Sequence, residues 1–191
     1  MLDAIAHLDT QLFVLFNSTL TNPALDWLMP AITEQENWYP VLGGLWVAMI
    51  IWGGRKGRMA AVMFVIAIAL ADQITCSCLK PLVGRLRPCN ALSPEQCRLL
   101  VGGSKAMSFP SAHASNSFAM ATVAAWRFRK FAPVFYVVAA LVAYSRVYVG
   151  LHYPFDVMAG AILGILLGRL AIWLVVYVSR WWERRRATAQ A

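Results

Sequence analysis

Three short stretches of the chain contain side chains of the kinds that bind and transfer phosphate. The stretches are KPLVGRLRP (80–88), SFPSAH (108–113) and SRVYVGLHYPFD (145–156). Guanidinium and ammonium groups bind phosphate oxygens through charge-assisted hydrogen bonds, and imidazole serves as a nucleophile or as a proton donor and acceptor. The side chains with this chemistry are Lys80, Arg85, Arg87, Ser111, His113, Arg146, His152 and Asp156. Their types predict chemistry on a phosphate group.

Two of these stretches border expected helices. Ser111 stands just before a helical run, where its hydroxyl can cap the helix and the free N–H groups beyond it form an anion seat. Asp156 follows His152 by four residues, so a helix beginning near Pro154 would allow a carboxylate–imidazole hydrogen bond. Each residue alone has a simpler explanation, since an arginine at a helix end usually snorkels to water. Taken together, the residues fit a phosphate site better.

The composition indicates a membrane protein. The chain has 191 residues, which suits one domain, and it is 60% hydrophobic and only 14% charged, with mean hydropathy +0.58. A soluble domain carries about a quarter charged residues. The apolar runs are continuous rather than alternating, which favours membrane helices over a β-barrel.

Five apolar runs are long enough, or nearly long enough, to cross a bilayer. They are 38–53, 59–80, 111–126, 131–147 and 154–179. A full crossing takes about 20 residues, so the first, third and fourth runs are short. The sequence predicts an all-α polytopic membrane helical bundle with about five to six transmembrane helices. Its transmembrane core is expected over 38–179 of a single domain, 1–191.

Residues 1–37 are predicted to form N-terminal amphipathic helices. Apolar residues recur there at helical spacing, with polar residues between them, and Pro23 stands where a helix could begin. The segment is too short and too mixed to span, so an interfacial position is expected. A sixth span there would change the position of the N-terminus alone.

The positive charge is concentrated in three loops and tails. Basic residues follow the first, third and fifth expected spans: Arg55, Lys56, Arg58; Arg127, Arg129, Lys130; and Arg180, Arg184, Arg185, Arg186. With five spans these clusters, including the basic tail 180–191, share one side, which the positive-inside rule makes cytoplasmic. The loops 81–110 and 148–153 then face outward. The net charge of +8 is thus a topology signal, and no nucleic-acid partner is expected.

The four cysteines divide into two pairs. Cys89 and Cys97 lie in the outward loop, where either a disulfide or two free thiols is compatible with the sequence, because spacing alone does not determine pairing. Cys76 and Cys78 are interpreted as small core residues of the second span. No Cys/His spacing typical of a metal site occurs.

On these residues the sequence resembles the type 2 phosphatidic acid phosphatase (PAP2) family, membrane relatives of the vanadium haloperoxidases. The family signature has three parts: Lys, six residues, Arg-Pro; Pro-Ser-Gly-His; and Ser-Arg, five residues, His, three residues, Asp. The corresponding parts here are 80–88, 110–113 and 145–156, within a resemblance covering about 59–165. Ala112 replaces the usual glycine and keeps the backbone N–H.

The resemblance implies a role for each matching residue. His152 would attack phosphorus and form a phosphohistidine, Asp156 would orient it, and His113 would protonate the leaving oxygen and then activate water. The groups expected to bind the substrate are Lys80, Arg87, Ser111, Ala112 and Arg146, while Arg85 is expected to lie behind them. No metal or other cofactor is implied.

The implied substrate is a lipid phosphate or diphosphate in the bilayer. The candidates are undecaprenyl diphosphate, phosphatidylglycerol phosphate and phosphatidate, and the outward-facing site slightly favours the first. The alternative is a lipid A phosphatase, or a lipid-to-lipid phosphotransferase using the same site. A non-catalytic anion-binding or lipid-transport protein disagrees with the intact set of site residues. The expected location is a bacterial inner membrane, with the site on the periplasmic side, and the oligomeric state is left open.

Overall fold

The computed structural model describes residues 2–102 and 107–189, and its regular elements are helices. The α-helices are α1 (Leu2–Val14), α2 (Pro23–Thr33), α3 (Tyr39–Ile51), α4 (Gly54–Asp72), α5 (Lys80–Val83), α6 (Pro88–Ala91), α7 (Ala112–Arg127), α8 (Ala132–Tyr148) and α9 (Pro154–Ala189). Short 3-10 or π-helical segments join them at Leu15–Thr19, Gln35–Asn37, Gln73–Leu79 and Arg129–Phe131. The predicted all-α class is confirmed.

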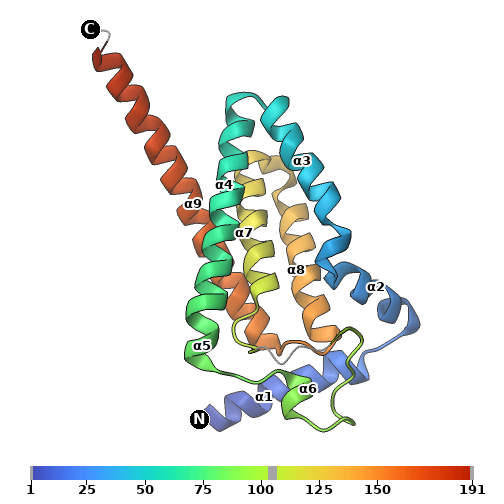
Figure 1. Cartoon of the computed structure of the whole chain (residues 1–191). Coiled ribbons are helices and arrows are strands. Elements are labelled where there is room, and N and C mark those ends of the chain that lie inside the picture. The colour runs from blue at the N-terminus through green and yellow to red at the C-terminus, as the bar shows by residue number, and fades with distance from the viewer. Residues whose placement is uncertain (1, 103–106, 190–191) are drawn as a thin grey trace.

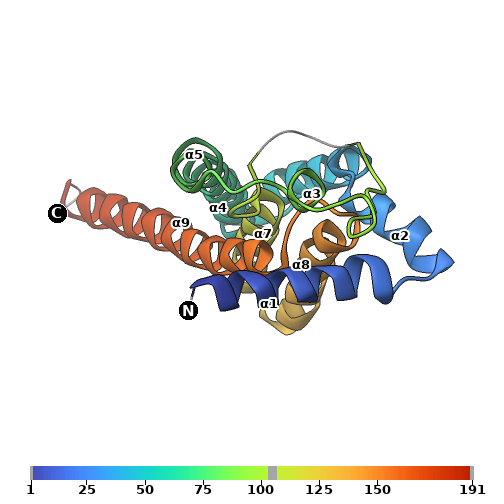
Figure 2. The same ribbon diagram turned by 90° about the horizontal axis from the view of Figure 1, so that it is seen from below.

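The bundle is organised around α7. This helix packs against α4, α8 and α9, while α3 packs on α4 and α2 on α8 (Figure 1). The first helix, α1, lies across one end of the bundle rather than along it (Figure 2). One end of the bundle is therefore covered by the N-terminal segment.

Small residues allow α7 and α9 to pack closely. A Cβ atom on Gly160 would lie 2.5 Å from the carbonyl oxygen of Ser111, and one on Gly164 would lie 2.2 Å from that of Ser115. Contacts this short exclude any side chain, so glycine is required at both positions. The close packing fixes the start of α7 against the start of α9.

The number of transmembrane helices is lower than the sequence suggested. Three helical stretches of the described chain are long and apolar enough to span: Gly54–Ala91, Arg129–Tyr148 and Pro154–Thr188. Helix α3 has 13 residues and α7 has 16. At 1.5 Å per residue these rise only about 20 and about 24 Å, short of a hydrocarbon core of about 30 Å. The prediction of a helical membrane bundle is confirmed, but the prediction of five to six spans is wrong.

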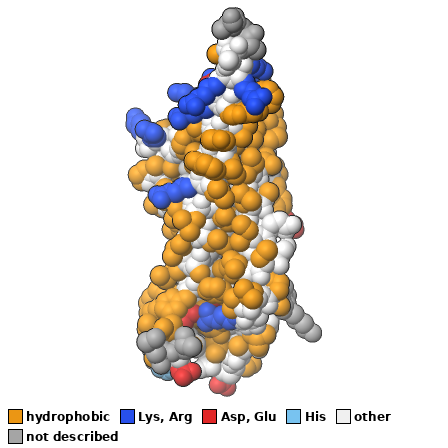
Figure 3. Space-filling model, turned by 90° about the vertical axis from the view of Figure 1, so that its left-hand side faces the viewer, with side chains coloured by type: hydrophobic (Ala, Val, Ile, Leu, Met, Phe, Trp, Pro, Cys, Tyr) orange, Lys and Arg blue, Asp and Glu red, His pale blue; other side chains and the backbone are white. Residues whose placement is uncertain are grey.

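The basic clusters gather at one end of the bundle. Arg55, at the start of α4, pairs with Glu183 and donates a 3.1 Å hydrogen bond to Ser179 of α9. Apolar side chains cover most of the face in Figure 3, and Lys and Arg side chains gather toward the end where the chain terminates. The loops that follow α5 and α8 lie at the opposite end (Figure 1).

Helix α1 buries one face against the bundle and exposes the other. Its outer face exposes Ile5 and Leu8, whereas Asp9 and Phe13 are buried against the bundle. Helix α2 begins at Pro23, and the side chain of Asn22 caps it by accepting a 2.9 Å hydrogen bond from the N–H of Leu25. The N-terminal segment thus forms two ordered helices that contact the rest of the protein.

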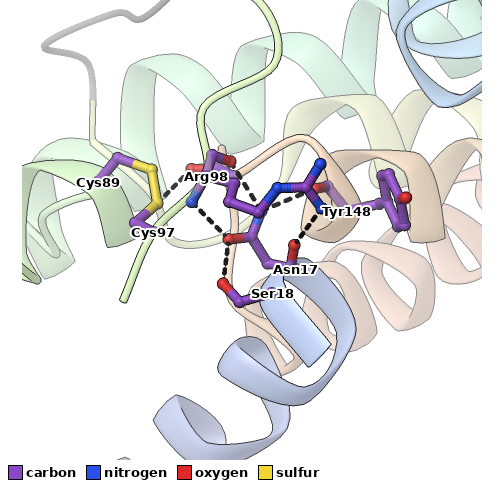
Figure 4. Close-up of a disulfide and its surroundings, with 7 residues drawn as sticks. Asn17, Ser18, Cys89, Cys97, Arg98 and Tyr148 are labelled. Carbon is purple, nitrogen blue, oxygen red and sulfur yellow. Dashed lines mark hydrogen bonds between the residues drawn. A yellow bond between two sulfur atoms is a disulfide. The ribbon is translucent and has the colours of Figure 1, made fainter. Parts of the chain in front are cut away.

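A disulfide between Cys89 and Cys97 resolves the pairing that the sequence left open. Beside it, the Asn17 amide donates hydrogen bonds to the carbonyl oxygens of Arg98 (2.8 Å) and Tyr148 (2.7 Å) (Figure 4). The Asn17 side-chain oxygen accepts a 2.7 Å hydrogen bond from the N–H of Arg98. These contacts join the disulfide loop, the N-terminal segment and the end of α8 into one layer.

Candidate active site

The stretch 145–156 comprises the last turn of α8, a short connection and the first residues of α9. Arg146 lies in the last turn of α8, and its carbonyl oxygen accepts hydrogen bonds from the N–H groups of Leu151 (3.1 Å) and His152 (3.2 Å). Gly150 adopts φ +90°, a left-handed conformation that favours glycine. Pro154 then starts α9, because its fixed φ suits the first helical position. The connection places His152 between the two helices.

Asp156 is the most extensively bonded side chain of the site. Its Oδ2 atom accepts hydrogen bonds from the hydroxyl of Ser108 and from the N–H of Tyr153 (2.9 Å), and lies 3.6 Å from Nδ1 of His152. Its Oδ1 atom accepts a 2.7 Å hydrogen bond from Arg85. The acid therefore faces one side of the His152 ring, which leaves Nε2 on the other side.

His152 is held as a neutral imidazole. The side chain is buried, and burial lowers its pKa to about 4, a shift that the nearby charges of Arg146 and Arg87 reinforce and the hydrogen bond with Asp156 opposes. Above that pH the ring is neutral, with a proton on only one of its two nitrogens. It thus carries a lone pair at neutral pH, as a nucleophile requires.

Three cations surround the two histidines. Lys80, Arg87 and Arg146 all lie close enough to His113 to interact with it electrostatically, as does His152. Arg87 is 9% exposed and Arg146 6%, and the Nε atom of each is buried without a hydrogen-bond partner among the described residues. Buried cations with unpaired donors are stabilised by an anion, so this cluster is suited to bind one.

The start of α7 faces the same place. The hydroxyl of Ser111 caps the helix by accepting a 3.4 Å hydrogen bond from the N–H of Ala114, and the N–H of Ser111 donates a 3.0 Å bond to the carbonyl oxygen of Asp156. The N–H groups of the first helical turn, which includes Ala112 and His113, have no acceptor within the helix. Ala112 is helical, a conformation that alanine adopts readily in place of glycine.

The structure brings together all the residues singled out as site candidates. At one end of the bundle lie Lys80, Arg87, Ser111, Ala112, His113, Arg146, His152 and Asp156. Arg85 joins this group through its ion pair with Asp156.

Sequence reasoning missed three residues that touch this cluster. Thr33 accepts a 2.7 Å hydrogen bond from Nη1 of Arg146, Asp9 forms a 2.8 Å ion pair with Arg85, and Ser108 donates to Asp156. Ser108 lies within SFPSAH and had a signal in that motif. For Asp9 the sequence signal was an acid within an expected amphipathic helix, whereas no sequence signal pointed to Thr33.

Comparison with known proteins agrees with this geometry. Residues 60–180 match the PAP2 superfamily. The chain is 37% identical over 185 residues to the lipid A 4'-phosphatase of Bacteroides thetaiotaomicron, an alignment that covers 94% of this chain and 80% of the relative. It is 35% identical over 137 residues to an undecaprenyl-diphosphatase of Sulfolobus acidocaldarius, covering 71% and 62%.

A solved structure has a similar fold. The crystal structure of Aquifex aeolicus LpxE superposes with a TM-score of 0.70 at 27% identity, covering 86% of this chain and 94% of that one. The family match includes the helices that carry all three polar stretches. With that match over more than half of its length, and a relative 37% identical along most of it, the chain belongs to the PAP2 superfamily of membrane lipid phosphatases.

Proposed function

We propose that this protein is a lipid A phosphatase that removes the 4'-phosphate. The observation that carries the proposal is the 37% identity to a lipid A 4'-phosphatase, which extends over 94% of the chain. The sequence alone slightly favoured undecaprenyl diphosphate. Similarity to the undecaprenyl-diphosphatase covers a smaller share, 71% of the chain, and makes that lipid the second candidate.

In the first step, Nε2 of His152 attacks phosphorus and the bond to the sugar oxygen breaks. Burial and the neighbouring cations lower the pKa of His113 to about 3, so this ring gains a proton when the phosphate anion binds beside it. His113 then passes the proton to the leaving oxygen, so that an alcohol rather than an alkoxide departs. Asp156 accepts a hydrogen bond from the N–H group at Nδ1 and stabilises the positive charge that develops on the ring. The product of this step is a phosphohistidine and a dephosphorylated lipid.

In the second step, water attacks phosphorus while His113 accepts its proton. The P–N bond breaks, inorganic phosphate leaves, and His152 returns to its neutral form. Through both steps the phosphoryl oxygens are held by the side chains and backbone amides that converge on the site: Lys80, Arg87, Ser111, Ala112 and Arg146. The charges of Lys80, Arg87 and Arg146 neutralise the transferred group, and the proposed mechanism includes no step through a metal.

We place the site at the periplasmic surface of a bacterial inner membrane. Two observations support this side. The three basic clusters lie at the opposite end of the bundle, which the positive-inside rule assigns to the cytoplasm. The Cys89–Cys97 disulfide lies at the site end, and disulfides persist in oxidising compartments. The acyl chains of the substrate would remain in the outer leaflet.

A substrate panel tests the proposal. Purified protein in detergent is expected to release phosphate from bis-phosphorylated lipid A faster than from undecaprenyl diphosphate, phosphatidylglycerol phosphate or phosphatidate, by about tenfold or more. Mass spectrometry should show loss of the 4'-phosphate and retention of the 1-phosphate. Faster release from undecaprenyl diphosphate would instead establish the second candidate.

The same assay separates hydrolysis from transfer. Lipid A carrying a labelled 4'-phosphate is incubated with and without an unlabelled acceptor lipid. We expect inorganic phosphate as the sole labelled product in both samples, because water completes the second step. Label in the acceptor lipid would show a phosphotransferase.

Thr33 gives a prediction about substrate binding. Thr33→Val keeps the shape of the side chain but removes the acceptor for Nη1 of Arg146, which is buried. A lost hydrogen bond to a charged group corresponds to about 1.5–3 kcal/mol, so we expect kcat/KM for phosphate release to fall about 10- to 100-fold. Thr188→Val is the matched control, because Thr188 is exposed at the other end of the protein. Equal kcat/KM for the two variants would contradict the prediction.

A further inference from the structure

Arg85 lies between two buried carboxylates that come from different parts of the chain. Its Nη1 atom is 2.7 Å from Oδ1 of Asp156, and its Nη2 atom is 2.8 Å from Oδ2 of Asp9. Asp9 is 1% exposed and Asp156 0%. Asp9 also accepts a 2.9 Å hydrogen bond at Oδ1 from the N–H of Phe155. Asp9 is thus connected to Asp156 both through the guanidinium and through the adjacent backbone.

Aromatic packing fixes the same guanidinium. The Arg85 group lies over the ring of Tyr153, with its central carbon 3.9 Å from the ring centroid. Phe13, one turn after Asp9 on α1, packs against that ring at a centroid distance of 5.4 Å. Helix α1 therefore supports Arg85 with a carboxylate on one side and, through Tyr153, with an aromatic contact on the other.

The negative charge of Asp9 offsets the positive charge that Arg85 places beside Asp156. If Arg85 paired with Asp156 alone, it would neutralise the acid that stabilises positive charge on His152 during attack. Asp9 adds a second carboxylate, so the group of Asp9, Arg85 and Asp156 carries a net negative charge. Burial raises the pKa of Asp9, while the bonds from Phe155 and Arg85 oppose that rise, so its charge depends on these contacts.

We propose that Asp9 is a positioning residue for the reaction. It holds Arg85 and the first turn of α9 so that Asp156 keeps the orientation and the charge that His152 requires. Asp9 lies on α1, outside the segment 60–180 that matches the family. The inference rests on the phosphohistidine mechanism proposed above and adds to it a contribution from the N-terminal helix.

The test begins with Asp9→Asn, which keeps the shape and an acceptor for the N–H of Phe155 but removes the charge. We expect kcat for phosphate release to fall about 10- to 50-fold with KM changed less than about threefold, since the cations that hold phosphate are untouched. Asp3→Asn is the matched control, because Asp3 is exposed on the same helix. The melting temperature of each purified variant is recorded alongside.

A double-mutant cycle tests whether Asp9 acts through Arg85. The variants are Asp9→Asn, Arg85→Gln and the double variant, each assayed for kcat and KM. If Asp9 acts through the guanidinium, the double variant should have a kcat within about twofold of Arg85→Gln alone. Full additivity would overturn that route. Wild-type kcat in Asp9→Asn, or a loss that only follows the fraction of folded protein, would overturn the proposal.

A second variant applies if Asp9→Asn fails to fold. Arg85→Lys keeps the charge, but a single ammonium cannot span two carboxylates as a guanidinium does, so kcat should fall while KM holds. Wild-type kcat in this variant would overturn the proposal. The assay uses whichever lipid phosphate the wild-type protein hydrolyses best. Failure of the wild type to act on lipid A would reject the proposed substrate, whereas failure of the inference would appear as active enzyme insensitive to these changes.

Discussion

His152→Gln is expected to lower kcat for phosphate release by about 10⁴-fold or more. Glutamine is of similar size and polarity, but its amide nitrogen has no available lone pair to attack phosphorus. The wild-type imidazole is buried with its pKa lowered to about 4, so it is ready to attack at neutral pH. Among the residues that the structure describes, no other histidine pairs with Asp156 and could replace His152.

The measurement is phosphate release, combined with a search for the covalent intermediate. Wild-type protein quenched in alkali after brief incubation with labelled substrate should retain label, because phosphohistidine survives there, and His152→Gln should retain none. His7→Gln is the matched control, since His7 is exposed on α1. A purified His152→Gln protein with normal turnover would show that the nucleophile is a different residue.

The sequence predicted the class of the fold because composition and unbroken apolar runs follow directly from burial in lipid. It overestimated the number of spans because apolar runs shorter than about 20 residues were counted as crossings. The run 111–126 forms α7, with bounds one residue away, but α7 has only 16 residues and buries Ser115 and Thr122 among its neighbours. A helix surrounded by other helices resembles a span in sequence without having the length of one.

Helix α9 extends beyond the apolar run of its expected span. The apolar run was expected to end at 179, with a basic tail from 180, but the helix continues to Ala189. Arginine and alanine favour helix, so the change from apolar to basic residues marks an expected membrane boundary without ending the helix. Polarity and secondary structure are separate signals, and only the first changes there.

The candidate site could be assembled from sequence where the chemistry requires particular residue types within short stretches. The supporting contacts could not, because they join distant positions: Asp9 bonds the N–H of Phe155 across 146 residues, and Thr33 bonds Arg146 across 113. The pairing of Cys89 with Cys97, which are 8 residues apart, was undetermined for a different reason, because spacing alone does not show whether two thiols are bonded. Tertiary packing decides such contacts, and local patterns contain little information about it.

Asp156→Asn is expected to lower kcat by about 10³-fold or more. The neighbours of the carboxylate are donors: Oδ2 accepts from Ser108 and Tyr153, and Oδ1 accepts from Arg85. An asparagine amide must place its NH₂ group against one of these donors in either orientation, so the side chain cannot keep the position of the acid. It also lacks the negative charge that, in the proposed mechanism, stabilises the His152 imidazolium.

Single-turnover kinetics separates this effect from that of losing the nucleophile. Asp156→Asn should still form labelled enzyme, but slowly, because His152 remains, with KM close to wild type since Lys80 and Arg87 are unchanged. The exposed Asp3→Asn is again the control. The backbone carbonyl of Asp156, which accepts from the N–H of Ser111, is retained in the variant. A rise in KM as large as the fall in kcat would therefore show that the side chain serves to shape the phosphate seat at α7 rather than to orient His152.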